Sequence, residues 1–276
     1  MPIPNELLRA FTAGRVIPYI GPGVLVLDSK CPLPATPEDL VARLTAKVTV
    51  PHKIRGNLTA AAQFIENFKH RKTVSTVMTD VFRVPATSTA LHQRLAAMKD
   101  LPLIIHAWYD DLSQQALRGR DDWGLVQGVS QAEHYGSWTH YFHNDGSPAQ
   151  STDAEHWSTL LYEPLGSVQP ASNFLVSDSD FVEVLTEIDI QTPIPARVQE
   201  LRCDRHILFL GCRFTTQIER TFARQIMKRS ADKHWAVLPH QMTRNEARFL
   251  TEQRIQPLVM DLSVFTTLFW GGTLAA

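Results

Sequence analysis

Short apolar runs alternate with longer amphipathic stretches along this chain. The apolar runs are bounded by turn residues and are too short for helices; they cover 16–20, 101–106, 159–162, 206–211, 235–238 and 255–258. Runs of this kind predict strands that are buried on both faces of a sheet. The stretches between them place apolar residues three and four positions apart, which predicts helices. This alternation predicts an α/β fold with a doubly wound, mostly parallel, Rossmann-like sheet.

One long helical stretch interrupts the alternation. Between the first and second predicted strands, residues 36–98 have helical periodicity almost throughout. The stretch starts at 36–39 with a capping threonine, a proline at the first helical position and acids in the first turn. We expect a helical subdomain at 36–98, inserted in a single domain that covers 1–276. The segment before it, 21–35, is rich in glycine and proline and is expected to be a mobile loop.

Composition and charge limit the classes of function. The chain has 276 residues, of which 44% are hydrophobic and 20% charged, so it can bury a substantial core. Its formal net charge of -1 provides no broad basic field, so binding to nucleic acid or to a membrane surface is not expected. Cys31, Cys203 and Cys212 are scattered, which indicates neither a disulfide framework nor a thiolate zinc site. These cysteines favour a reducing cytoplasm, and no signal peptide or membrane-spanning run is recognisable.

The first predicted strand runs into two glycines one residue apart. Residues 16–25 read Val-Ile-Pro-Tyr-Ile-Gly-Pro-Gly-Val-Leu. Such a strand end exposes backbone N–H groups, and the missing Cβ atoms of Gly21 and Gly23 allow a phosphate to approach the main chain. A tight turn without a ligand is the alternative, because the third glycine of the dinucleotide fingerprint is absent.

Four stretches now resemble, in order, those of SIR2-like (sirtuin-like) NAD-binding domains. Residues 16–25 resemble the first strand and glycine loop of that family. The segment 106–112, His-Ala-Trp-Tyr-Asp-Asp-Leu, lies where the family has Thr-Thr-Asn-Tyr-Asp-Asp-Leu. Leu-Gly-Ser at 165–167, followed by 177–181, is similar to the His-Gly motif and the helix start behind it. Residues 209–214 resemble the strand end that meets the nucleotide ribose.

The resemblance implies a site for NAD or a related adenine nucleotide. Carried over motif by motif, the implied cofactor-binding residues are Gly21, Pro22, Gly23, Val24, Leu25, Trp108, Tyr109, Asp110, Gly166, Ser167, Gly211, Cys212 and Arg213. The similarity is to the bacterial SIR2-like group, which lacks the four-cysteine zinc module of sirtuin deacylases, and this agrees with the cysteines here.

The departures from the family motifs concern its chemistry. Trp108 replaces the asparagine that positions the nicotinamide ribose and a water, and Leu165 replaces the histidine that helps with proton transfer. Neither replacement can accept a proton. Leu25 replaces the loop serine, and Pro22 removes one N–H that could face phosphate. By its size, the Trp108 indole is expected to fill part of the nicotinamide pocket, although it could instead stack on a ring of the ligand.

Other polar residues have two readings each. His106 ends a predicted strand and could serve as a displaced catalytic base, or it could be a neutral histidine bonded to backbone. Arg213 could bind a phosphate or form a salt bridge. If 138–143 is a strand, His140 and His143 point to opposite faces, so no shared metal is expected.

Three functions stay open. The preferred one is a SIR2-like nucleotide-binding protein with little or no family-type catalysis, acting as a sensor or assembly partner. The second is an active NAD glycohydrolase that uses His106. The third is a non-binding structural or interaction module whose partner, or second copy, contacts the 36–98 helices. Protein deacylation ranks last.

Overall fold

A computed structural model describes residues 2–187, 193–239 and 241–271, and its centre is a sheet in the order β11-β10-β9-β1-β2-β6-β3-β4-β5. Its strands are β1 (Val16–Ile20), β2 (Leu103–His106), β3 (Trp123–Gly128), β4 (Thr139–His143), β5 (Pro148–Ala149), β6 (Thr159–Glu163), β9 (His206–Leu210), β10 (His234–Leu238) and β11 (Ile255–Val259). A small second sheet pairs β7 (Gly166–Ser167) with β8 (Asn173–Phe174). The strands from β11 to β3 pair in parallel, while β4 and β5 add an antiparallel edge. The predicted mostly parallel α/β fold is confirmed.

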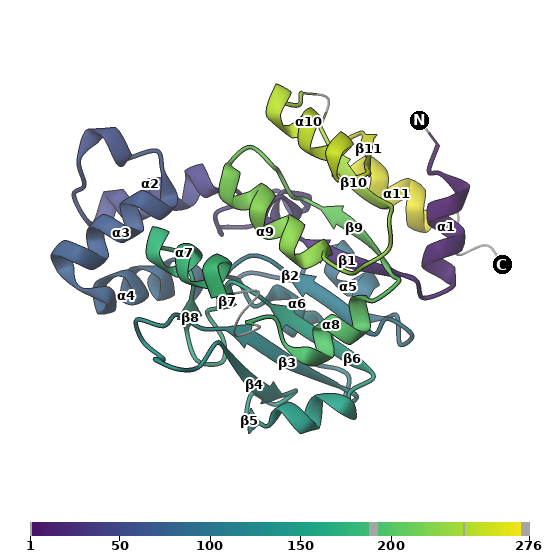
Figure 1. Cartoon of the computed structure of the whole chain (residues 1–276), viewed down its shortest axis with the longest axis horizontal. Coiled ribbons are helices and arrows are strands. Elements are labelled where there is room, and N and C mark those ends of the chain that lie inside the picture. The colour runs from purple at the N-terminus through teal and green to yellow at the C-terminus, as the bar shows by residue number, and fades with distance from the viewer. Residues whose placement is uncertain (1, 188–192, 240, 272–276) are drawn as a thin grey trace.

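Helices cover both faces of this sheet (Figure 1). The α-helices are α1 (Asn5–Thr12), α2 (Pro37–Lys47), α3 (Leu58–Lys69), α4 (Arg71–Phe82), α5 (Ala90–Ala96), α6 (Leu112–Leu117), α7 (Asp178–Glu187), α8 (Ala196–Arg202), α9 (Gln217–Met227), α10 (Arg244–Glu252) and α11 (Leu262–Gly271). Short 3-10 helices are η1 (Pro22–Leu27), η2 (His52–Ile54) and η3 (Ser151–Glu155). The predicted cap of α2 is present, because the Thr36 side chain accepts from the Asp39 N–H.

Strand side chains divide the interior into two cores. In β1, Ile17 and Tyr19 point into a first core with α2–α4 and α7–α10, while Val16 and Ile20 point into a second core with α1, α5 and α11. The alternation follows from the two-residue period of a strand. No helix of the described residues is long and apolar enough to cross a membrane.

The helices of the 36–98 stretch do not all pack together. α2, α3 and α4 contact one another, whereas α5 packs against α6 and η1 toward the second core. Whether 36–98 behaves as a subdomain stays a prediction. The segment 21–35, expected to be a loop, contains η1 and buries Val24 and Leu25.

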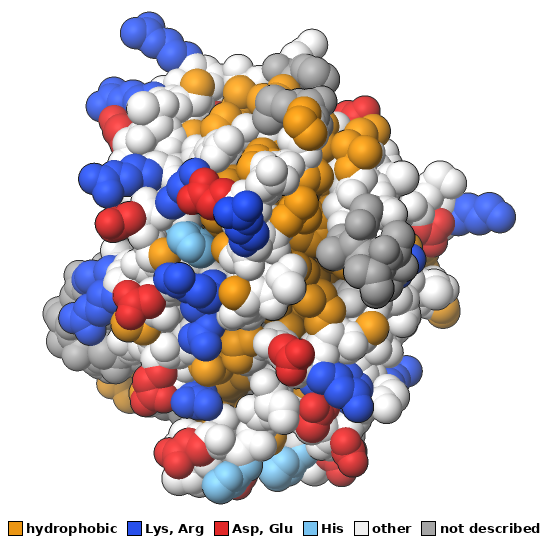
Figure 2. All heavy atoms as spheres, turned by 90° about the vertical axis from the view of Figure 1, so that its right-hand side faces the viewer, with side chains coloured by type: hydrophobic (Ala, Val, Ile, Leu, Met, Phe, Trp, Pro, Cys, Tyr) orange, Lys and Arg blue, Asp and Glu red, His pale blue; other side chains and the backbone are white. Residues whose placement is uncertain are grey.

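The face that carries α1 and α11 has a hydrophobic band (Figure 2). Val264 and Leu268 of α11 contribute exposed apolar side chains to the surface of the molecule. Acidic and basic groups are intermixed around the band, so the visible face has no field of one sign.

Candidate functional site

The segments that resemble the family motifs meet at the C-terminal edge of the sheet. Ile20 pairs with His106 on one side and Leu210 on the other, so the residues after β1, β2 and β9 emerge side by side. Backbone bonds continue past the strand ends, from the Ala107 N–H to the Ile20 carbonyl at 2.8 Å and from the Gly21 N–H to the Leu210 carbonyl at 2.8 Å. We call this edge, with the segments 21–25, 108–110, 165–167 and 211–213, the nucleotide edge.

The glycine loop packs against the protein's own main chain. The Gly23 N–H donates to the Gly211 carbonyl at 2.9 Å, and the Val24 N–H donates to the Gly21 carbonyl at 3.2 Å. A Cβ added at Gly21 would lie 2.7 Å from Cys212 Sγ and 2.7 Å from the Gly211 oxygen, and one at Gly23 would lie 2.9 Å from that same oxygen. The close approach for which these glycines are needed is therefore made by the Gly211–Cys212 backbone. Pro22 has no N–H to offer.

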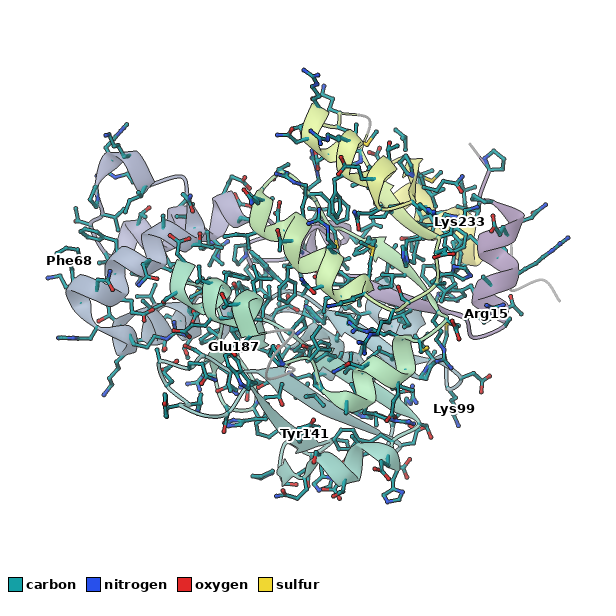
Figure 3. The ribbon with its side chains drawn as sticks, in the orientation of Figure 1. Arg15, Phe68, Lys99, Tyr141, Glu187 and Lys233 are labelled. Atoms are coloured by element: carbon teal, nitrogen blue, oxygen red, sulfur yellow. The ribbon has the colours of Figure 1, made fainter. Side chains whose placement is uncertain are left out.

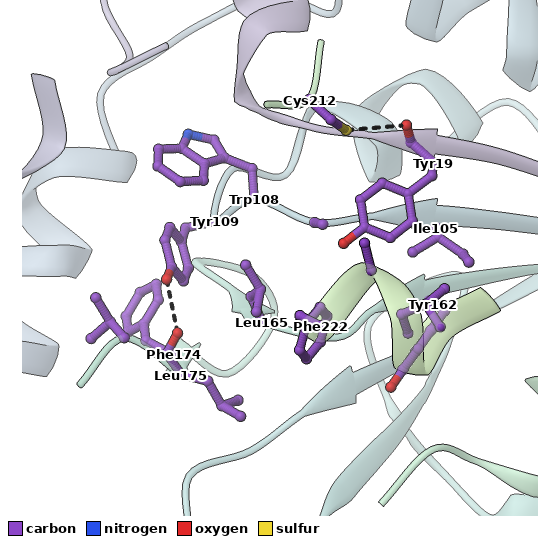
Figure 4. Packing of buried hydrophobic residues seen from close by; sticks show 14 of the residues in the cluster. Tyr19, Ile105, Trp108, Tyr109, Tyr162, Leu165, Phe174, Leu175, Cys212 and Phe222 are labelled. Atoms are coloured by element: carbon purple, nitrogen blue, oxygen red, sulfur yellow. Dashed lines mark hydrogen bonds between the residues drawn. The ribbon is translucent and has the colours of Figure 1, made fainter. Parts of the chain in front are cut away.

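Trp108 and Leu165 lie inside the first core (Figure 4). The Trp108 side chain is 4% exposed, and its Nε1–H donates to the Pro34 carbonyl at 2.9 Å. Its ring meets that of Phe82 edge-on, with centroids 6.0 Å apart. Of the two expectations for Trp108, filling space is the one that this packing supports.

The segments after β2 and β6 are hydrogen-bonded within the chain. The Tyr109 hydroxyl donates to the Leu175 carbonyl at 2.8 Å, and the Ser167 hydroxyl donates to the Asp110 carbonyl at 3.0 Å. Asp110 Oδ1 accepts the Leu112 N–H at 3.0 Å, at the start of α6. Gly166 has φ of 75°. These contacts hold the β7 segment against the residues after β2.

Cys212 and Arg213 are also engaged within the chain. The Cys212 thiol lies 3.7 Å from the Tyr19 carbonyl, and burial raises its pKa. The Arg213 guanidinium binds Glu246 through both carboxylate oxygens, at 2.8 and 2.7 Å. Burial raises the pKa of Glu246, but the Arg213 bonds and backbone N–H groups of Thr243 and Phe214 outweigh it and lower that pKa to about 2. The salt bridge considered for Arg213 is therefore present, and its planar fork is occupied.

The model of the SIR2-like domain family matches residues 102–258. The chain belongs to the SIR2-like family. No curated protein matches the chain. The matched region contains three of the four segments of the nucleotide edge, while the glycine loop lies before it.

Members of the SIR2-like family generally bind NAD, but the described nucleotide edge of this SIR2-like domain does not fit that ligand. The Gly21 and Gly23 N–H groups are bonded, and the space beside them is filled. A cavity between the ends of β3 and β6 and the helices α7 and α9, with a volume of about 10 Å³, has room for about one water and is lined by residues outside this edge.

The His106 ring lies on the opposite face of the sheet from Trp108 and contacts Asp110 of the nucleotide edge from that side. By the alternation of β2, its side chain lies on the side of the second core, opposite Ile105. Its Nδ1 is 2.7 Å from Ser113 Oγ, and its Nε2 is 3.3 Å from Asp110 Oδ2. Burial lowers the pKa of His106, but the neighbouring Asp110 carboxylate raises it more. This placement does not suit a base acting on a ligand beside Trp108.

His92 is a residue that the sequence patterns did not single out. It lies at the third position of α5, where its Nδ1 is 2.9 Å from the Thr89 hydroxyl. Its side chain is buried, and Nε2 has no hydrogen-bond partner among the described residues. Burial and the neighbouring His106 lower the pKa of His92 to about 4, so the ring is neutral. A Thr-x-x-His capping pattern at 89–92 was the available signal.

The histidines near β4 lie apart from this group. His134 Nε2 is 3.1 Å from Asn173 Oδ1, and its ring meets that of His140 with centroids 4.6 Å apart. His143 lies on the other face of β4 and is 3.8 Å from Asp153.

A second unexpected group is the buried Glu163 carboxyl at the end of β6. It accepts from Gln127 Nε2 at 2.7 Å and from Gln114 Nε2 at 3.0 Å. Burial raises the pKa of Glu163 to about 8. Glu163 follows an apolar strand, and this position did not predict its hydrogen bonds with Gln127 and Gln114.

Proposed function

We propose that this SIR2-like domain does not turn over NAD and acts instead as a structural and interaction module. The observation that carries the proposal is the bonding of the glycine loop, whose Gly21 and Gly23 N–H groups donate to Leu210 and Gly211. Trp108 and Leu165 add apolar bulk where the family has its asparagine and histidine, and neither side chain can move a proton.

Chromatography of the reaction mixture tests this directly. The full chain is incubated with NAD, and nicotinamide is measured against a buffer blank and an active NAD glycohydrolase. The expected result is no release above the blank. Release in proportion to protein concentration would overturn the proposal, and comparison with His106→Ala would then show whether the displaced-base mechanism applies.

Binding of NAD or a related adenine nucleotide without turnover is the second candidate. It is favoured by the convergence of four family-like segments at one strand edge, which is where open α/β sheets bind ligands. Binding would require Trp108 and the Pro34 segment bonded to it to move together. Calorimetry with NAD, ADP-ribose, ATP and FAD separates the candidates, because saturable heat with any of them supports the second and contradicts the first.

The 36–98 helices offer the surface for an interaction role. Phe68 is 66% exposed at the outer end of α3, and its ring stacks on Phe64 with centroids 4.4 Å apart (Figure 3). Exposed aromatic groups are enriched at protein interfaces. We propose that this end of a helical subdomain, within one SIR2-like domain, contacts a second copy or another protein. Light scattering of the wild type and Phe68→Ser tests the second-copy case, and a monomer at all concentrations would exclude it.

A further inference from the structure

Three potential ligand atoms face one another in the second core. They come from His92 of α5, His106 at the end of β2 and Asp110 in the segment before α6, and one ligand atom of each residue lies within 4.8 Å of those of the other two. The three side chains are buried, at 1–2% exposure. His92 Nε2 is the decisive atom, because a buried polar atom without a partner is costly unless something occupies the space before it.

The opposite atoms of these side chains are held by other groups. His92 Nδ1 is 2.9 Å from Thr89 Oγ1 and accepts the Thr89 backbone N–H at 3.3 Å, and Ser113 Oγ is 2.7 Å from His106 Nδ1. Asp110 Oδ1 accepts the Leu112 N–H. Metal-ligating histidines donate their other ring N–H to a partner of this kind, so His92 would ligate through Nε2 with its proton on Nδ1, donated to the Thr89 hydroxyl in place of the bond from the Thr89 backbone.

The spacing is close to that of a metal centre. Ligand atoms with bonds of about 2.0–2.2 Å to one tetrahedral zinc ion lie about 3.3–3.6 Å apart. His106 Nε2 and Asp110 Oδ2 are already 3.3 Å apart. The ligand atom of His92 lies within 4.8 Å of both and would have to approach them to complete the set. Two imidazoles and a carboxylate suit divalent first-row transition metals better than calcium or magnesium.

We infer that His92, His106 and Asp110 bind one divalent transition-metal ion of the zinc class. Because the site is buried and joins α5 to the start of α6, the ion stabilises this part of the fold and meets no substrate. We expected no metal from the sequence, where only the cysteines, His140 and His143 were considered as ligands. The inference is independent of the proposed function.

Titration of the full chain with two ions tests the site. Protein stripped with a chelator is titrated with Zn²⁺ in a calorimeter and with Co²⁺ in a visible spectrometer. We expect one equivalent of Zn²⁺ to bind and Co²⁺ to give the absorption of a site with nitrogen and oxygen ligands. Absence of Zn²⁺ uptake, or Co²⁺ spectra identical to the free ion, would overturn the inference.

Variants assign the bound ion to these residues. His92→Gln removes one ligand. A glutamine at this third helical position can still accept the N–H of Thr89, the residue that caps α5, so the helix start is preserved. It should weaken Zn²⁺ binding at least 100-fold. Ser113→Ala, which alters an outer bond, should weaken it about tenfold. The control His156→Gln lies at an exposed position and should change nothing. Equal losses in His156→Gln and His92→Gln, or no loss in both His92→Gln and Ser113→Ala, would contradict the assignment.

Discussion

Replacing Trp108 with alanine removes the largest side chain at the nucleotide edge. The indole is almost fully buried among Phe82 and Tyr109. Truncation of a buried tryptophan costs about 3–5 kcal/mol, and loss of the bond to the buried Pro34 carbonyl adds about 1 kcal/mol. The expected decrease in the free energy of unfolding is therefore about 5 kcal/mol. Trp108→Phe keeps a ring and should lose only about 1–2 kcal/mol.

Urea unfolding followed by circular dichroism measures both decreases. With a slope of about 3 kcal/mol/M, the midpoint of Trp108→Ala should fall by about 1.7 M. Tyr135→Ala is the control, because Tyr135 is 96% exposed and its removal should change the free energy by less than about 0.5 kcal/mol. If Trp108→Ala lost under about 1.5 kcal/mol, or no more than Tyr135→Ala, the indole would not be a packed part of the edge.

Two substitutions probe the glycine loop and the buried carboxyl. Gly21→Ala should destabilise the fold by about 2 kcal/mol in the same urea assay, because the added Cβ meets the backbone after β9. Gly56→Ala is the control and should have almost no effect, because the space around Gly56 is open. Equal stability of the two variants would contradict the close packing at Gly21. The folded pKa of Glu163, about 8, lies above its unfolded value, so its contribution is present below about pH 4.5 and is lost as the pH rises toward 8. Between pH 5 and 8 the free energy of unfolding of the wild type should fall relative to Glu163→Gln by up to about 1.4 kcal/mol per pH unit, and parallel curves would show that Glu163 is already ionised.

The strand framework could be predicted because short apolar runs such as those of β1, β2 and β9 are stable when both of their faces are buried in a parallel sheet. The role of the glycines could not be predicted. A glycine pair at a strand end indicates that another group approaches the main chain closely, and either a phosphate or the Gly211–Cys212 backbone would require glycine there.

The histidines illustrate a different limit. The two-residue period of β2 places His106 opposite Ile105, but only the packing of α5 shows that His92 faces it across the second core. His92 lies in a helix more than ten residues earlier, and sequence spacing carries no information on such long-range contacts. The same holds for Arg213, whose partner Glu246 comes from α10.

Calorimetric titration of the full chain with NAD tests the central claim most directly, because it asks whether the nucleotide edge is closed by its own backbone, indole and aliphatic atoms. The predicted result is no saturable heat up to millimolar NAD. A one-to-one isotherm with a micromolar Kd would contradict the account.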